Sequence, residues 1–180
     1  MSVHPAIAPG QVAVINGGAN GIGLAAARRF AGMGLKVAVA DRDRDQLALA
    51  RQALGEGHLA IETDVADPAS VAALAQQVAG QLGPVAVLMN NAGVGRGGDV
   101  LAPREAWDRV LGVNLLGVLN GVQQFVPAMV EGDAPGLVIN TGSKQGITQP
   151  PGDTAYNVSK AGVKALTEGL AHTLREKTGG

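Results

Sequence analysis

The amino-acid sequence predicts an α/β fold, a doubly wound parallel sheet covered by helices on both faces. Apolar runs of strand length alternate with longer segments of helical pattern, an order typical of βα units joined by right-handed crossovers. The runs are mostly continuous, as expected for parallel strands buried on both faces. The chain has 27 glycines and only 2% aromatic residues. This composition favours helices packed closely on a sheet over an aromatic core.

Five strands are predicted, at residues 11–16, 35–41, 58–64, 85–90 and 137–142. Five helices follow them, and their starting residues carry recognisable signals. Asp67 followed by Pro68 is an N-cap with proline at the first helical position. The other helices are expected to begin at Gly21 and near Asp43, Pro103 and Asp153.

Length and charge limit the organisation and the partners. The 180 residues, with no linker or repeat, fit one domain over residues 1–180. Fourteen basic and fifteen acidic residues give a net charge of −1, so we expect neither a nucleic-acid partner nor an anionic membrane surface. The first ten residues lack a secretory pattern. There are no cysteines, which fits a reducing, cytoplasmic compartment.

One uncharged segment, residues 111–130, is about long enough to cross a bilayer. It contains polar residues and a proline that would be costly in hydrocarbon. These residues are Asn114, Asn120, Gln123, Gln124 and Pro127. A helix buried inside the fold therefore explains the segment better than a membrane span.

A glycine-rich loop, NGGANGIG at residues 16–23, closes the first strand and opens the first helix. Gly17 allows a tight turn, Gly21 lets the backbone approach a pyrophosphate, and Gly23 lets the helix close on the sheet. Free amides at the helix N-terminus would face the anion. We expect a dinucleotide here, with Asn20 and Ile22 also contributing, although a glycine-rich turn without a ligand is the alternative.

The ends of the second and third strands supply further candidate residues. Asp41 lies eighteen residues beyond Gly23, where a carboxylate typically binds an adenosine ribose. A 2′-phosphate would meet like charge there, so NAD is favoured over NADP, although Arg42 or Arg44 would favour a phosphate. The alternative is that Asp41 only caps the second helix. Asp64 and Val65 would flank the adenine, unless Asp64 is an ordinary strand-end residue.

The only tyrosine, Tyr156, precedes Lys160 by four residues at the start of the last helix. At about 1.5 Å per residue the two lie roughly 6 Å apart along one helical face. A nearby ammonium favours ionisation of a phenol, and this would make Tyr156 useful as a general base. The three histidines, His4, His58 and His172, lack metal-ligand spacing, so no metal site is expected.

Four motifs in order show that the sequence resembles the short-chain dehydrogenase/reductase family. The glycine loop is similar to that family's TGxxxGxG motif, with Asn16 in place of threonine. NNAG, which includes Asn91, Ala92 and Gly93, matches its motif after strand four. Asn114 lies in the fourth helix, where the family carries a catalytic-site asparagine. Ser143 precedes Tyr156 by thirteen residues, and YNVSK fits YxxxK.

The resemblance implies a Rossmann-type fold and an oxidoreductase that moves hydride between NAD and a secondary alcohol or ketone. Tyr156 would be the acid/base and would also contact the cofactor, and Ser143 would bind the substrate oxygen. Lys160 would favour the phenolate and hold the nicotinamide ribose, and Asn114 would anchor a proton-passing water. The segment 144–152 would border the substrate.

The resemblance also implies homodimers or homotetramers through helices four and five. The fifth helix carries small residues that permit close approach, at Ala155, Gly162, Ala165 and Gly169.

Family members normally continue into two more strands and a substrate lid, so the fifth strand of this chain would lie at a sheet edge. The alternative function is therefore a non-catalytic dinucleotide-binding remnant or interaction protein. A second alternative is an enzyme of the same fold that uses bound NAD for epimerisation or dehydration.

Overall fold

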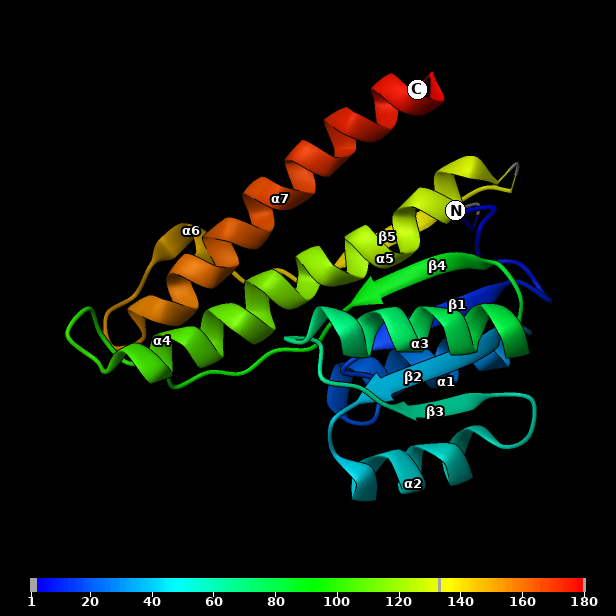
Figure 1. The fold of residues 1–180 in the computed structure, drawn as a ribbon, viewed down its shortest axis with the longest axis horizontal. Helices are drawn as coiled ribbons and strands as arrows, with labels where there is room; N and C mark the ends of the chain where they lie inside the picture. Colours follow the sequence, from blue (N-terminus) through cyan, green and yellow to red (C-terminus); the bar gives the residue numbers. More distant parts are fainter. Residues whose placement is uncertain (1–2, 133, 180) are drawn as a thin grey trace.

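The computed structural model describes residues 3–132 and 134–179. Five parallel strands form one sheet in the order β3-β2-β1-β4-β5 (Figure 1). The predicted doubly wound sheet is confirmed, with β5 at one edge. The strands are β1 (Val12–Asn16), β2 (Lys36–Asp41), β3 (Leu59–Glu62), β4 (Val85–Asn90) and β5 (Leu137–Asn140).

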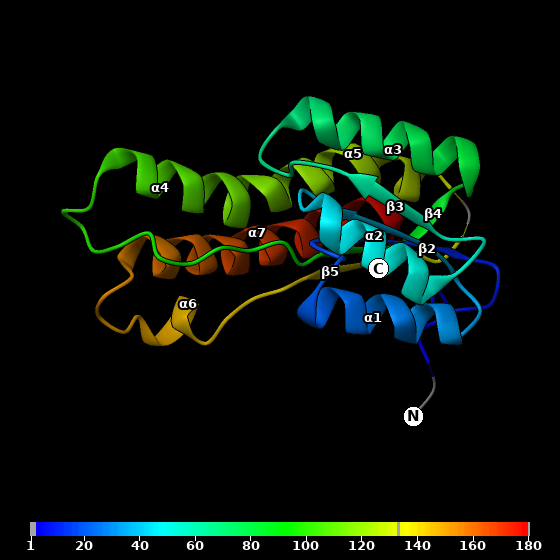
Figure 2. The same ribbon diagram turned by 90° about the horizontal axis from the view of Figure 1, so that it is seen from below.

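Helices cover both faces of the sheet (Figures 1 and 2). Two lie on one face, α1 (Gly21–Gly32) and α2 (Arg44–Leu54). On the other face lie α3 (Pro68–Gln81), α5 (Gly117–Glu131) and α7 (Thr154–Thr178). The helices α4 (Arg104–Leu111) and α6 (Gln145–Thr148) lie with the first turns of α7 beyond the carboxyl ends of the strands.

Successive residues of the strands point to opposite faces, and this divides the core into two apolar layers. In β2, Val37 and Val39 belong to the layer under α1 and α2, together with Phe30. Ala38 and Ala40 belong to the layer under α3 and α5. Both sides of the strand are therefore buried, which explains its continuous apolar sequence.

The predicted helix starts are confirmed, and two carry the expected side-chain caps. Asp43 caps α2 by accepting hydrogen bonds from the amides of residues 45 and 46, and Asp67 caps α3 before Pro68. Asp153 precedes α7 but makes no cap bond with it. Its carboxylate instead accepts hydrogen bonds from the amides of Arg96 and Gly97, at 2.9 and 3.0 Å. It thereby ties the segment after β4 to the start of α7.

The predicted fourth helix consists of α4, a π-helical turn η1 (Gly112–Leu116) and α5. Over residues 104–131 it is long and apolar enough to cross a membrane by length and composition alone. However, α5 packs on β4, α3 and α7, and Phe125 and Val126 lie in the core. Its apolar face is therefore explained by burial within the fold, as expected from the sequence.

A row of asparagine side chains crosses the carboxyl ends of β1, β4 and β5. Asn16, Asn90 and Asn140 are in register, and Asn16 Nδ2 donates to Asn90 Oδ1 at 2.9 Å. Asn90 Nδ2 donates to Asn140 Oδ1 at 2.9 Å, and Asn140 Nδ2 donates to Thr167 Oγ1 of α7 at 3.0 Å. Asn16, which replaces the threonine of the family motif, thus joins β1 to the row. Gly121 of α5 lies directly against it.

Substituting Gly121→Ala should destabilise the fold, because the added methyl group would collide with Asn90 Oδ1 and lie 3.1 Å from Asn16 Nδ2. We expect the free energy of unfolding to fall by about 1–3 kcal/mol. Gly80→Ala in α3 is the matched control, since no other group lies within 4 Å of its added Cβ. Alanine there should stabilise the helix by about 0.5–1 kcal/mol. Equal denaturation midpoints for the two variants would contradict the close packing described for Gly121.

Candidate functional site

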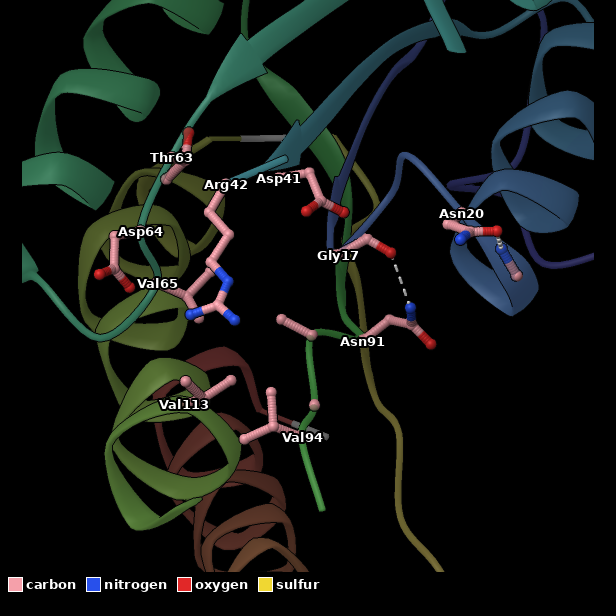
Figure 3. Close-up of a pocket in the computed structure, with 13 residues that line it drawn as sticks. Gly17, Asn20, Asp41, Arg42, Thr63, Asp64, Val65, Asn91, Val94 and Val113 are labelled. Atoms are coloured by element: carbon pink, nitrogen blue, oxygen red, sulfur yellow. Dashed lines mark hydrogen bonds between the residues drawn. The ribbon is translucent and has the colours of Figure 1, made fainter. Parts of the chain in front are cut away.

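A cleft of about 360 Å³ opens at the carboxyl ends of β1, β2, β3 and β4 (Figure 3). Most of the residues predicted to bind a dinucleotide come together here, although they come from four separate segments of the chain. The lining residues are Gly17, Asn20, Gly21, Asp41, Arg42, Thr63, Asp64, Val65, Asn91, Ala92, Gly93, Val94 and Val113.

The glycine loop has a backbone that side chains would obstruct. Gly17 and Gly21 are left-handed, with φ of 69° and 52°, a conformation that glycine adopts at no steric cost. A Cβ on Gly17 would lie 2.6 Å from the Ala92 backbone, and a Cβ on Gly23 would collide with the Gly17 carbonyl. Asn91 Nδ2 donates to that carbonyl at 2.9 Å (Figure 3). The loop is therefore held between α1 and the segment after β4.

The N-terminus of α1 can accept an anion. Asn20 Oδ1 accepts a hydrogen bond from the amide of Gly21 at 2.6 Å. The amides of Ile22 and Gly23 have no hydrogen-bond partner among residues 3–132 and 134–179, as expected for the first turn of a helix. The side chain of Ile22 is 69% exposed, and neither Ile22 nor Gly23 lines the cleft. Free amides and a favourable helix dipole thus fit a pyrophosphate.

Asp41 lies at the end of β2 and faces the glycine loop. Its carboxylate accepts hydrogen bonds from the amides of Ala19 and Asp43, both at 3.3 Å. Because Asp43 is the cap of α2, the alternative that Asp41 only caps this helix is wrong.

The two arginines that follow differ in their surroundings. Arg44 pairs with Glu62 at 2.7 Å, and this hydrogen bond raises the pKa of the exposed guanidinium. Arg42 instead extends into the cleft beside Asp41 (Figure 3). Arg42 is therefore the arginine positioned to meet a ligand in this cleft.

Sequence reasoning missed Thr63, Val94 and Val113 in this cleft. Thr63 and Val94 directly adjoin predicted site residues, so extending the strand-end motifs by one residue would have included them. Val113 lies in the π-helical turn and had no sequence signal.

A second group of residues adjoins the cleft at Gly93. Lys160 Nζ lies 5.8 Å from the centre of the Tyr156 ring and donates a hydrogen bond to the Thr141 carbonyl at 2.9 Å. A Cβ on Gly93 would lie 3.9 Å from Lys160 Nζ and 3.6 Å from Asn114 Oδ1. Gly93 thus borders both the cleft and the predicted catalytic residues.

Lys160 is only 5% exposed, and burial lowers its pKa from the ordinary value of 10.5. Within the described part of the chain no carboxylate forms a salt bridge with it. The ammonium is therefore buried without a compensating charge, an arrangement that costs stability and is concentrated at functional sites.

Asn114 lies in the π-helical turn η1 and is fully buried. Its side chain accepts a hydrogen bond from the Val94 amide at 2.7 Å and donates to the Val94 carbonyl at 2.8 Å. Its Nδ2 also donates to Ser159 Oγ at 3.1 Å. The side-chain amide therefore ties the segment after β4 to α7, as expected if a buried hydrogen bond is the reason for an asparagine inside this helix.

Ser143 lies in the segment between β5 and α6. Its Oγ accepts a hydrogen bond from the amide of Gln145 at 3.2 Å, at the first residue of α6. A Cβ on Gly146 would lie 2.7 Å from the backbone of Lys160, so α6 packs tightly on α7. This short helix, which was not predicted, positions the serine segment against the helix that carries Tyr156 and Lys160.

The profile of the family described as short chain dehydrogenase matches residues 11–178. The chain belongs to the short-chain dehydrogenase/reductase family. A relative named oxidoreductase asL5, from Sarocladium schorii, is 36% identical over 171 residues, covering 93% of this chain and 68% of the relative. The fold and the order of the motifs agree with this membership.

Solved structures of family members with bound nicotinamide cofactors are also similar. A short-chain dehydrogenase/reductase from Burkholderia phymatum in complex with NAD is 40% identical, with a TM-score of 0.90 over 93% of this chain and 61% of that one. A metagenomic short-chain oxidoreductase in complex with NADP is 32% identical, with a TM-score of 0.88 over 95% and 79%. The present chain thus spans 61–79% of the lengths of these three similar proteins.

The buried ammonium of Lys160 should make stability depend on pH. Between its lowered pKa and about 10.5, the unfolded chain binds a proton that the folded chain does not, so stability rises with pH in this window. Lys160→Met removes this contribution while keeping a long side chain. The Tm of wild type relative to this variant should therefore increase from neutral pH to about pH 10. A difference in Tm that is constant over the range would contradict the burial of a charged Lys160.

Proposed function

We propose that the chain binds NAD and catalyses hydride transfer between NAD and a secondary alcohol or ketone. The observation that supports this most strongly is the position of Lys160, whose ammonium lies beside the Tyr156 ring and next to Gly93. Gly93 lines the cleft together with Asn20 and Gly21, the cap and the first residue of α1. A dinucleotide in that cleft would therefore have its reactive end beside a phenol and an ammonium.

NAD is favoured over NADP because Asp41 presents a carboxylate where the adenosine ribose would lie. The two backbone amides that bind this carboxylate hold it in place. A 2′-phosphate would meet like charge at this point. Arg42 in the same cleft provides a competing positive charge, and similar proteins have been solved with either NAD or NADP.

In the direction of alcohol oxidation, Tyr156 would take the proton of the substrate hydroxyl, and in the reverse direction it would act as the acid. NAD, when bound, supplies the hydride acceptor. The buried ammonium of Lys160, 5.8 Å from the ring centre, would place a positive charge beside the phenol. One N–H of Lys160 is used by the Thr141 carbonyl, so two remain for the ribose hydroxyls and for a water.

Ser143 would hydrogen-bond the substrate oxygen and orient it toward Tyr156. Its Oγ accepts only the weakly placed amide of Gln145, at 3.2 Å, so its O–H remains free to donate. Asn114 would support a water near Lys160. Because its side-chain amide already makes three hydrogen bonds, that water would bind through the remaining lone pair or through the backbone carbonyl.

We further propose that residues 1–180 form the dinucleotide-binding and catalytic domain of a cytoplasmic homo-oligomer. The interface would involve α5 and α7. Two of the small residues in α7 already pack within the chain, since Ala155 contacts Gly97 and Gly162 contacts Leu115. Ala165 and Gly169 are exposed and are the residues left to permit close approach of a second copy.

Tyr156→Phe should abolish turnover, because the ring is kept but no group remains to exchange the substrate proton. NADH binding should be unchanged, since the phenol hydroxyl makes no hydrogen bond within the described residues. Binding is measured by the fluorescence of NADH on mixing, and turnover with a panel of secondary alcohols and ketones. Activity that persists in this variant would refute the role of Tyr156. A wild-type chain that binds NADH but turns over nothing would favour the non-catalytic alternative.

Asp41→Asn should reduce the preference for NADH over NADPH, because it removes the negative charge beside the 2′ position. We expect the ratio of the two dissociation constants to fall about tenfold, a change of about 1.4 kcal/mol. Asp64→Asn is the matched control, since it removes a charge from the same cleft. The Asp64 amide, which was expected to contact the adenine, instead donates to Ser70 Oγ at 3.0 Å. An equal change of the ratio in both variants would contradict the role of Asp41.

A further inference from the structure

A second row of hydrogen bonds runs one residue beyond the asparagine row and joins the glycine loop to Lys160. The Gly17 carbonyl accepts from Asn91 Nδ2 at 2.9 Å, and Asn91 Oδ1 accepts from Thr141 Oγ1 at 3.2 Å. The Thr141 carbonyl accepts from Lys160 Nζ at 2.9 Å. Three consecutive hydrogen bonds therefore connect the turn that would hold the phosphates with the lysine of α7.

The Thr141 hydroxyl supports the orientation in which the donor end of the Asn91 side chain faces the Gly17 carbonyl, which can only accept a hydrogen bond. A carboxamide has a donor end and an acceptor end of nearly the same shape. With Thr141 Oγ1 donating to Oδ1, the Nδ2 group is left to face the Gly17 carbonyl. Without that donor, Asn91 Oδ1 would lose the partner it has among the described residues, and only the Gly17 carbonyl would hold the carboxamide in place.

The position of Asn91 leaves little room for another arrangement. A Cβ on Gly23 would lie 2.8 Å from Asn91 Nδ2, so the carboxamide is packed directly beneath the first turn of α1. The amide of Asn91 donates to the Asn16 carbonyl, and the amide of Thr141 donates to the Asn90 carbonyl, both at 3.0 Å. Both residues are thus held by backbone bonds that continue the sheet, and their side chains remain available to bind the loop.

We propose that Thr141 is a positioning residue for cofactor binding, which acts through Asn91 on the Gly17 turn. It does not line the cleft, so it acts without touching the dinucleotide. Its backbone carbonyl holds Lys160, and one residue therefore fixes the position of the glycine loop relative to the catalytic helix. This proposal rests on the proposed function, because it concerns binding of a dinucleotide in the cleft.

The test compares Thr141→Val with Thr141→Ser in the full chain. Valine keeps the shape but removes the donor, and serine restores the donor. Thr167→Val is the matched control, because it removes a hydroxyl that accepts from Asn140 in the neighbouring row and has no connection to Asn91. Dissociation constants for NADH, ADP-ribose and adenosine are measured for each variant, together with the Tm.

For Thr141→Val we expect the dissociation constants of NADH and ADP-ribose to rise about threefold to tenfold, the effect of one hydrogen bond. That of adenosine, which has no phosphates, should be unchanged. Thr141→Ser should bind like wild type, and Thr167→Val should lower only the Tm.

Three results would overturn the proposal. In the first, Thr141→Val binds NADH and ADP-ribose as tightly as wild type does. In the second, Thr141→Val weakens the binding of adenosine as much as that of NADH. In the third, Thr141→Ser fails to restore the binding of NADH and ADP-ribose. In each case the proposed function still stands if the wild-type chain binds NADH. A wild-type chain that binds neither NADH nor ADP-ribose would overturn both.

Discussion

The site depends on one constraint, which is that the carboxyl ends of the parallel strands β1, β4 and β5 lie in register. Residue 16 of β1, residue 90 of β4 and residue 140 of β5 are paired in register, and their asparagine side chains hydrogen-bond in sequence. The next residues along each strand are therefore also level. They begin the glycine loop, the segment after β4 and the segment that carries Ser143. A shift of one strand by a single residue would turn its side chains to the other face and separate these segments.

The aligned strand ends also hold the ammonium of Lys160, which has no compensating negative charge. Lys160 comes from α7, which crosses the strand ends, and its ammonium lies over the Thr141 carbonyl rather than beside a carboxylate. A carboxylate partner would stabilise the ammonium but would also offset the positive charge on which the proposed role of Lys160 depends. Burying the Lys160 ammonium without a carboxylate partner therefore lowers the stability of the folded chain. The surrounding helices η1, α6 and α7 restrict the movement of the residues next to Lys160.

Local signals in the sequence predicted the strands, the helix starts and the glycine loop. The cap at Asp67-Pro68 and the continuous apolar runs of the strands depend only on residues that are close together in the sequence. They could therefore be recognised without knowing the fold. The π-helical turn, the one-turn helix α6 and the bonds between side chains could not. Asn114 binds Val94 from twenty residues away and Thr141 binds Asn91 from fifty, and these contacts exist only once the strands are aligned. The family resemblance named Asn114, whereas Thr141 had no signal.

A crystal structure of the chain with NADH would test the account most directly. The account predicts the pyrophosphate within hydrogen-bond distance of the Ile22 and Gly23 amides and the adenosine ribose at Asp41. The nicotinamide should lie beyond Gly93, beside Tyr156 and Lys160. A dinucleotide that is bound away from the strand ends, or whose nicotinamide points away from Tyr156, would contradict the central claim that the aligned strand ends bring cofactor and catalytic residues together.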